Sequence, residues 1–102
     1  MSGSAKLAKR ERNLELYEAI LKVETLDECV RFFDDLCSVN ELRAIEQRFQ
    51  VARLLSEGHI YNTILEQTGA SSATISRVNR SLHYGADGYD AIFKKMDLKR
   101  DG

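Results

Sequence analysis

The stretch TGASSATISRV, residues 68–78, decides the fold because it lies between two short segments of helical spacing. It places a glycine and two serines directly before apolar residues that recur at helical intervals. The turn of a helix-turn-helix requires a residue with positive φ, which glycine adopts at little steric cost. We therefore predict that two short helices, over about residues 60–68 and from Ser71 or Ser72 to about His83, meet at Gly69.

The side chains around Gly69 fit this arrangement. Leu65, four residues before it, is bulkier than the small residue usually favoured there. At about 100° per residue, Leu82 shares the inner side of the second helix. The other positions that should face inward are apolar or small: Ile60 and Ile64 before the glycine, and Ala70, Ile75 and Val78 after it.

The opposite side of the second helix has the chemistry of a DNA contact. Small residues let a helix enter a major groove, and hydroxyl and guanidinium groups supply donors for base edges and phosphates. The helix N-terminus adds free amides suited to phosphate. No acid occurs between Glu66 and Asp87. The predicted DNA-binding residues are Ser72, Ala73, Thr74, Ser76, Arg77 and Arg80, with Asn62 and Thr63 of the first helix near the DNA backbone.

The chain before this pair also predicts helices. Two adjacent apolar stripes predict a helix over residues 7–23, whose apolar face is wide enough to be buried on two sides or against another chain. Thr25 and Glu28 have capping-box spacing before a second amphipathic helix, over 26–37.

Ser38 and Glu41 repeat the capping-box spacing before a long helix that should stop at Gly58. Asp87 is available as the N-cap of a last helix. The apolar residues expected along one face of the long helix are Leu42, Ile45, Phe49, Ala52 and Leu55, and those of the last helix are Tyr89, Ile92, Phe93 and Met96.

The composition favours one all-helical domain. Of the 102 residues, 43% are hydrophobic and 30% charged, a globular balance, and proline is absent. A β-rich chain would need more turn residues. Cys29 and Cys37 lie about 12 Å apart along one helix, too far for a disulfide, which fits a reducing compartment. We expect a cytoplasmic protein with no membrane span and no signal peptide.

The net charge of −1 does not by itself indicate a nucleic-acid-binding protein. Residues 1–22 carry five Lys and Arg against three Glu, whereas residues 23–41 carry six acids against Arg31 alone. Any DNA contact must therefore come from a small basic patch.

The sequence predicts no catalytic or metal site. His59 and His83 are isolated and lack metal-ligand spacing relative to the cysteines. No phosphate-binding glycine loop occurs, and no Ser/His/Asp set can be assembled. We therefore predict a protein that binds rather than catalyses, with no cofactor.

From about Leu14 to Met96 the chain resembles the tryptophan-repressor superfamily, and most closely its YerC/YecD-type repressor-like branch. The segments that carry the resemblance are LCSVNELRAIEQR at 36–48, ARLLSEG at 52–58 and TGASSATISRVNRSL at 68–82, with RFFDDLC at 31–37 and YGADGYD at 84–90.

The resemblance implies a six-helix, all-α domain that forms an intertwined homodimer on double-stranded DNA. It assigns the helix-turn-helix to about residues 60–83 and the dimerisation helices to about 7–57 and 88–98. A two-fold dimer presents two recognition helices about one DNA turn apart, ~34 Å, and reads a roughly palindromic operator.

In the tryptophan-binding members of the superfamily, two arginines and a threonine line the effector pocket. The matching positions here are Arg48, Arg77 and Ser38. Val78 replaces the glycine that leaves room for the indole, so we expect that tryptophan is not the effector. The alternative for Arg48 is an ion pair with a neighbouring acid. The alternative for the whole chain is a protein–protein interaction module that uses the same fold.

Overall fold

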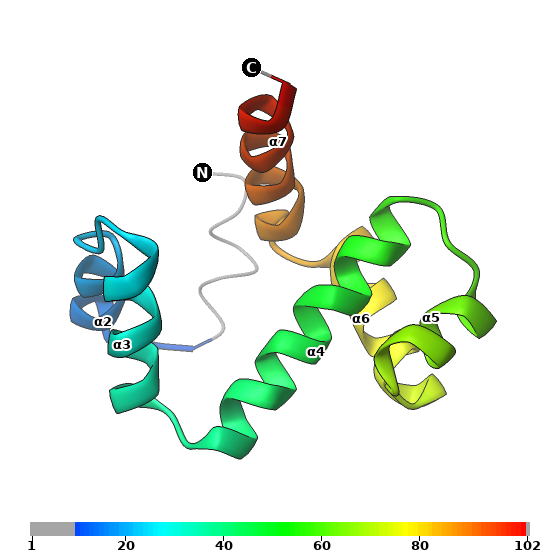
Figure 1. The fold of residues 1–102 in the computed structure, drawn as a ribbon, viewed down its shortest axis with the longest axis horizontal. Coiled ribbons are helices and arrows are strands. Elements are labelled where there is room, and N and C mark those ends of the chain that lie inside the picture. Colours follow the sequence, from blue (N-terminus) through cyan, green and yellow to red (C-terminus); the bar gives the residue numbers. More distant parts are fainter. Residues whose placement is uncertain (1–9, 102) are drawn as a thin grey trace. The chain divides into compact units, whose positions relative to one another are not determined.

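The computed structural model describes residues 10–101, with side chains as far as Asp97. The described residues form helices and no strands, which confirms the all-α prediction (Figure 1). The chain divides into two compact units, residues 1–45 and 46–102. Within the described part, no helix has the length and apolar character needed to cross a bilayer. The helices are α2 (Leu14–Ile20), α3 (Leu26–Leu36), α4 (Val39–Ser56), α5 (Tyr61–Thr68), α6 (Ser72–Tyr84) and α7 (Gly88–Asp101).

The first described helix is shorter than the predicted helix over 7–23. Asn13 has extended backbone angles, and its side chain accepts a hydrogen bond from the Glu15 amide at 3.1 Å, so the helix begins at Leu14. It ends at Ile20, before a turn. The prediction was therefore too long at both ends, and its residues 7–9 lie outside the described part of the chain.

The capping boxes predicted for the next two helices are present, one of them in altered form. The Thr25 hydroxyl accepts from the Glu28 amide at 3.1 Å, but the Glu28 carboxylate accepts from Glu24, one residue earlier than expected, at 2.8 Å. At the start of α4 the box is fully reciprocal, with bonds of 2.8 and 3.2 Å between Ser38 and Glu41. Both helix starts were correctly predicted.

The part of the first unit that the structure describes, residues 10–45, contains no buried residue. Some of its apolar side chains, such as Phe32 and Phe33, are half-buried, whereas Leu21 is 83% exposed and Leu26 is 81% exposed. Cys29 and Cys37 are half-buried free thiols, as predicted. Local hydrogen bonds therefore cap these helices, but a single copy of this segment has no buried core.

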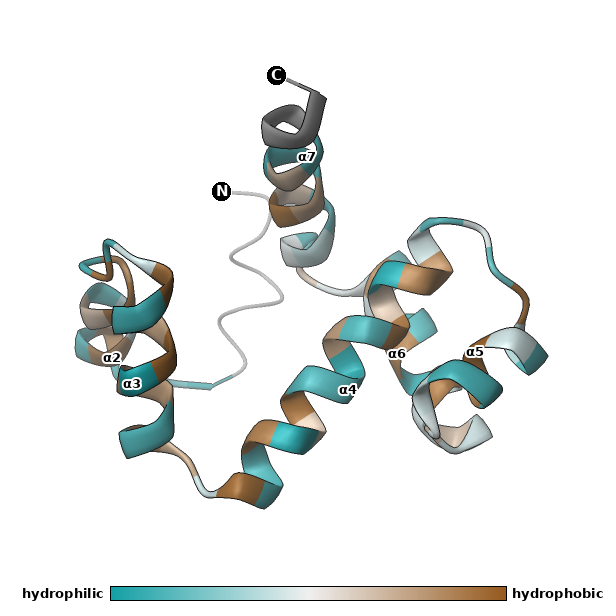
Figure 2. Cartoon of the chain, in the orientation of Figure 1, coloured by the Kyte–Doolittle hydropathy of each residue, from teal (hydrophilic) through white to brown (hydrophobic). Residues whose placement is uncertain are grey.

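The second unit contains the core. Apolar and polar residues alternate along α4 (Figure 2), and two of its residues, Val51 and Ala52, are completely buried. Ala52 was predicted to lie on the inner face, whereas Val51 was not. Phe49, also predicted there, remains 38% exposed but packs edge-on against Phe93 of α7. The whole core cluster is Val51, Ala52, Ile64, Ala70, Ile75, Val78 and Phe93.

Besides Gly69 between α5 and α6, Gly58 and Asp87 have left-handed backbone angles at helix ends of this unit. Gly58 follows α4 with φ +90°, as a glycine helix stop predicts. Asp87 precedes α7, and its carbonyl accepts from the Ala91 amide at 3.2 Å, but its φ is +66° instead of the extended value of an ordinary N-cap. The last helix was therefore placed correctly, with an unexpected backbone geometry at its start.

Candidate nucleic-acid interface

The turn between α5 and α6 is built on Gly69, as predicted. Its φ is +69°, in the left-handed region, and its amide donates to the Leu65 carbonyl at 2.9 Å. We call α5, this turn and α6, residues 61–84, the helix pair. Because the left-handed residue ends α5 abruptly, only three residues separate α5 from the start of α6.

Thr68 and Gln47 fix this turn by hydrogen bonds. The Thr68 hydroxyl donates to the Ile64 carbonyl at 2.7 Å and accepts from the Ala70 amide at 3.1 Å. The Thr68 carbonyl, at the end of α5, accepts from the side-chain amide of Gln47 on α4 at 3.1 Å. A helix-end carbonyl that has no partner within its helix is thus satisfied by a neighbouring helix.

Ser71 is the N-cap of α6, which decides between the two serines that the sequence left open. Its hydroxyl accepts from the Thr74 amide at 3.1 Å and donates to the Thr74 hydroxyl at 3.0 Å. Thr74 is half-buried, and its hydroxyl is already engaged by the cap. No acid lies in the first turn of α6, so the N-terminal end of the helix keeps its positive dipole uncompensated.

The inner side of the helix pair agrees with the predicted inward positions, with one exception. Ile64 and Ile75 are 0% exposed, and Ala70 and Val78 are 2% exposed. Ile60 was predicted to face inward but is 67% exposed. It is the N-cap residue of α5 with an extended backbone, so its side chain does not follow the helical periodicity.

The outer side of α6 lies open to solvent. The exposed residues there include Ser72, Ala73, Ser76, Arg77 and Arg80. On the first helix of the pair, Asn62 is exposed and Thr63 is half-buried. The structure therefore brings five of the six α6 candidates to one surface, while Thr74 lies at its edge.

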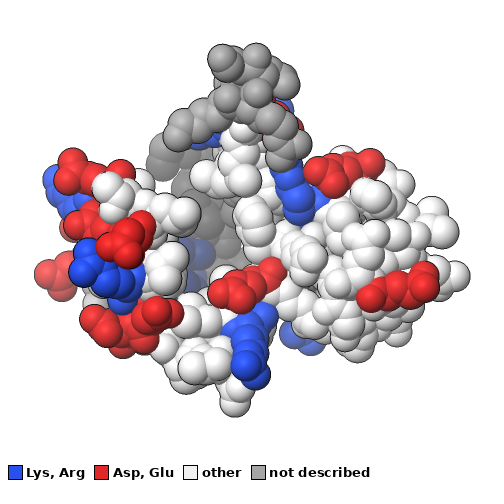
Figure 3. Space-filling model, viewed as in Figure 1, with Lys and Arg blue, Asp and Glu red and all other residues white. Residues whose placement is uncertain are grey.

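The charge distribution on this side is simple. The only formally charged side chains of α6 are those of Arg77 and Arg80. On the face drawn in Figure 3, acidic side chains gather over α2 and α3, while most of the surface over α5 and α6 is uncharged. A surface of hydroxyls and two cations without acids can approach a polyanion without like-charge repulsion.

The candidate effector residues have similar surroundings within the described chain. Arg48, Arg77 and Ser38 are each exposed. Val78, which was predicted to replace a glycine of the tryptophan-binding members, is buried in the core. No described carboxylate pairs with Arg48, so the ion pair predicted for it is not formed among these residues.

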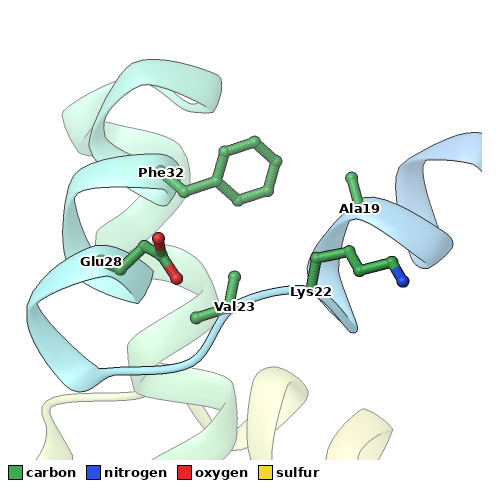
Figure 4. Close-up of a pocket in the computed structure, with 5 residues that line it drawn as sticks. All are labelled: Ala19, Lys22, Val23, Glu28 and Phe32. Atoms are coloured by element: carbon green, nitrogen blue, oxygen red, sulfur yellow. The ribbon is translucent and has the colours of Figure 1, made fainter.

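A hollow of about 220 Å³ lies elsewhere, between the end of α2 and α3 (Figure 4). The Glu28 carboxylate in its wall already accepts a backbone amide, and Lys22 extends away from the Phe32 ring. One oxygen of the Glu28 carboxylate is therefore engaged by the helix cap, and the Phe32 and Val23 side chains supply apolar lining. None of the predicted site residues lines it.

Sequence reasoning missed Gln47 as a contributor to the helix pair. Its bond to Thr68 joins residues 21 positions apart, and no local motif signals such a contact. Gln47 lies within the segment at 36–48 that carries the family resemblance, but nothing there distinguishes it from a solvent-exposed glutamine.

Comparison with known proteins agrees with this architecture. The family model described as Trp repressor protein matches residues 11–97. A curated relative, the uncharacterized protein YerC of Bacillus subtilis (strain 168), is 54% identical over 82 residues, which are 80% of this chain and 79% of YerC.

Solved structures agree as well. A candidate Trp repressor from Staphylococcus aureus superposes with a TM-score of 0.82 at 49% identity and covers 89% of this chain and 92% of its own. A TrpR-like protein from Eubacterium eligens ATCC 27750 gives the same TM-score and identity, over 90% of this chain and 95% of its own. With a matching family model, a close relative and two solved structures of the same fold, this chain belongs to the Trp repressor family.

Proposed function

We propose that this chain is a sequence-specific DNA-binding transcriptional regulator of the repressor type, which acts by binding and not by catalysis. The division of α6 into two sides is the observation that supports the proposal most directly. Ile75 and Val78 anchor the helix in the core, and the exposed side presents small residues, hydroxyls and two guanidinium groups. These are the groups that fit a major groove and donate to base edges and phosphates.

A homodimer is part of the proposal. Within residues 10–45 no side chain is buried in a single copy, and large apolar side chains such as Leu21 and Leu26 remain almost fully exposed. Such faces are stabilised when another chain covers them. A second copy would supply that cover and place two α6 helices on one duplex. Sedimentation should therefore detect a dimer; a stably folded monomer at micromolar concentration would contradict it.

Tryptophan is not proposed as the effector. Val78 stands where the tryptophan-binding members of the superfamily have a glycine, and its branched side chain is 2% exposed, which supports a pocket without room for indole. Calorimetric titration of the chain with L-tryptophan up to about 1 mM, a weak affinity on the usual scale, should give no binding heat. Saturable binding that disappears in Arg48→Ala would instead support a tryptophan site formed by Arg48, Arg77 and Ser38.

The experiment that tests DNA binding is a fluorescence or gel-shift titration with genomic fragments. The double variant Arg77→Ala, Arg80→Ala removes both cations of α6 without touching the core, so we expect its affinity to fall at least about tenfold. Arg31→Ala, on α3, is the matched control and should bind as the wild type does. Unchanged binding by the double variant would exclude the exposed side of α6 as the interface.

The second candidate function is a protein–protein interaction module. A net charge of −1 favours it, because most DNA-binding domains are basic. In that case the chain would not retain duplex DNA at any salt concentration, and the Arg77 and Arg80 substitutions would weaken capture of a protein partner instead.

A further inference from the structure

Gln47 stands at the polar end of the buried face of α4. It lies one helical turn before Val51, so both side chains project from the same side of the helix. Val51 is completely buried in the core that includes Ile64 and Ile75 of the helix pair. One turn earlier, the side-chain amide of Gln47 donates a hydrogen bond to the backbone carbonyl of Thr68 at 3.1 Å.

The carbonyl that Gln47 binds lies at the end of α5, next to the turn that leads into α6. Thr68 is the last residue of α5, and Gly69 turns the chain directly after it. The Thr68 hydroxyl is already used, since it donates to Ile64 and accepts from Ala70. A movement of the Thr68 carbonyl would therefore carry the turn and the start of α6 with it.

The two kinds of contact between α4 and the helix pair act differently. The apolar contacts around Val51 and Ala52 hold the pair against α4 but are not directional, so they resist separation more than rotation. A hydrogen bond is directional and weakens steeply when its angle changes. We propose that Gln47 is a positioning residue, which fixes the orientation of α6 on α4 through the Thr68 carbonyl. The positioning role of Gln47 stands without the proposed function. Its consequence, that the orientation of α6 governs DNA affinity, rests on the proposed function.

The variant that tests this inference is Gln47→Met. Methionine keeps the length and approximate volume of the side chain and removes the amide donor. Gln50→Met is the matched control, because Gln50 lies three residues further along α4 and is exposed. Residual dipolar couplings of backbone amides report the orientation of α5 and α6 relative to residues 46–56 of α4, and they can be measured on the full-length chain without DNA.

In Gln47→Met we expect the couplings of α5 and α6 to depart from those of the wild type, while their helical pattern persists. Exchange of the Ala70 amide should become faster, and Gln50→Met should match the wild type in both measurements. If Gln47→Met only melts at a lower temperature and keeps the wild-type couplings, Gln47 contributes stability alone and the inference is wrong.

The DNA measurement separates this inference from the proposed function. Duplexes are first selected by the wild-type chain from a random 24-base-pair pool. Against a selected duplex, Gln47→Met should lose about five- to tenfold in affinity, the typical worth of one hydrogen bond. The slope of affinity against salt should not change, because no phosphate contact is removed. If the wild type selects no duplex, the proposed function fails, whereas the couplings still decide whether Gln47 orients α6.

Discussion

The guanidinium of Arg53 joins α4 to α7 by an ion pair with the carboxylate of Asp97, 2.5 Å from Nη2 to Oδ1 and 44 residues further along the chain. The same guanidinium lies 4.8 Å from the centroid of the Phe93 ring and 3.5 Å, at Nε, from the Glu57 carboxylate. Because the Arg53 side chain is only 14% exposed, these contacts are less screened than ordinary surface pairs.

Arg53→Met should therefore lower the free energy of unfolding by about 1–2 kcal/mol, since it removes two ion pairs and a cation–π contact but retains apolar volume. Urea denaturation at fixed protein concentration measures this. Arg31→Met is the control: Arg31 pairs with Asp27 at 2.8 Å, but both side chains are about three-quarters exposed. Its effect should stay below about 0.5 kcal/mol. Equal effects of the two substitutions would contradict the role given to Arg53.

Gly69→Ala should destabilise the chain through backbone strain alone. A Cβ at this position would meet no atom within 4 Å, but the φ of +69° is unfavourable for an L-residue. We expect a loss of about 1–2 kcal/mol in thermal or urea unfolding. Gly88→Ala is a matched comparison, because its Cβ also meets nothing and its φ is not in the left-handed region. That substitution should be neutral or stabilising, and a stable Gly69→Ala protein would count against the strained turn.

Glu41 should make the start of α4 sensitive to pH. The hydrogen bond from the Ser38 amide, followed by that with the Ser38 hydroxyl, lowers the pKa of the Glu41 carboxyl below its ordinary value of 4.5. The folded state therefore favours the ionised form, and the resulting stability is present above about pH 4.5. It is lost as the pH falls through the lower pKa of the folded chain.

The measurement is a carboxyl-carbon NMR titration together with unfolding between pH 6 and 3. Glu41→Gln should be less stable than the wild type at pH 6, with the difference shrinking towards pH 3. Glu46→Gln, at an exposed position on the same helix, removes a carboxylate without touching the capping box and serves as the control. A Glu41 titration midpoint at or above 4.5 would show that the reciprocal capping box does not persist in solution.

DNA affinity should depend steeply on salt if α6 contacts phosphates. Each cation that neutralises a phosphate releases counterions, so the logarithm of affinity falls linearly with the logarithm of salt concentration. Between roughly 50 and 200 mM salt we expect a clear loss of binding, and Arg80→Ala should reduce the slope by about one. A flat salt response would favour the protein–protein interaction module.

Local rules predicted the features of this chain that depend on near neighbours. The positive φ of Gly69 and the caps at Thr25 and Ser38 follow from interactions over three or four residues, and the structure agrees with each. The burial of Ile64 and Ile75 followed from periodicity counted outward from the glycine. These signals are short-range, so one sequence is enough to read them.

The features that were missed depend on contacts between distant segments or on the exact limits of a helix. Val51 is buried because the helix pair packs beside it, and the partners of Gln47 and Arg53 are 21 and 44 residues away. Ile60 fits a helical stripe by spacing, yet it falls on the residue just before α5, where that spacing does not apply.

The absence of any buried side chain in residues 10–45 of a single copy has a consequence for the cell. If a second copy completes that segment, folding and assembly become one mass-action equilibrium, and the fraction of intact regulator rises with its own abundance. Scarce copies would be degraded faster than plentiful ones. A fragment retaining this segment but lacking α6 would sequester full-length subunits and act as a dominant-negative inhibitor.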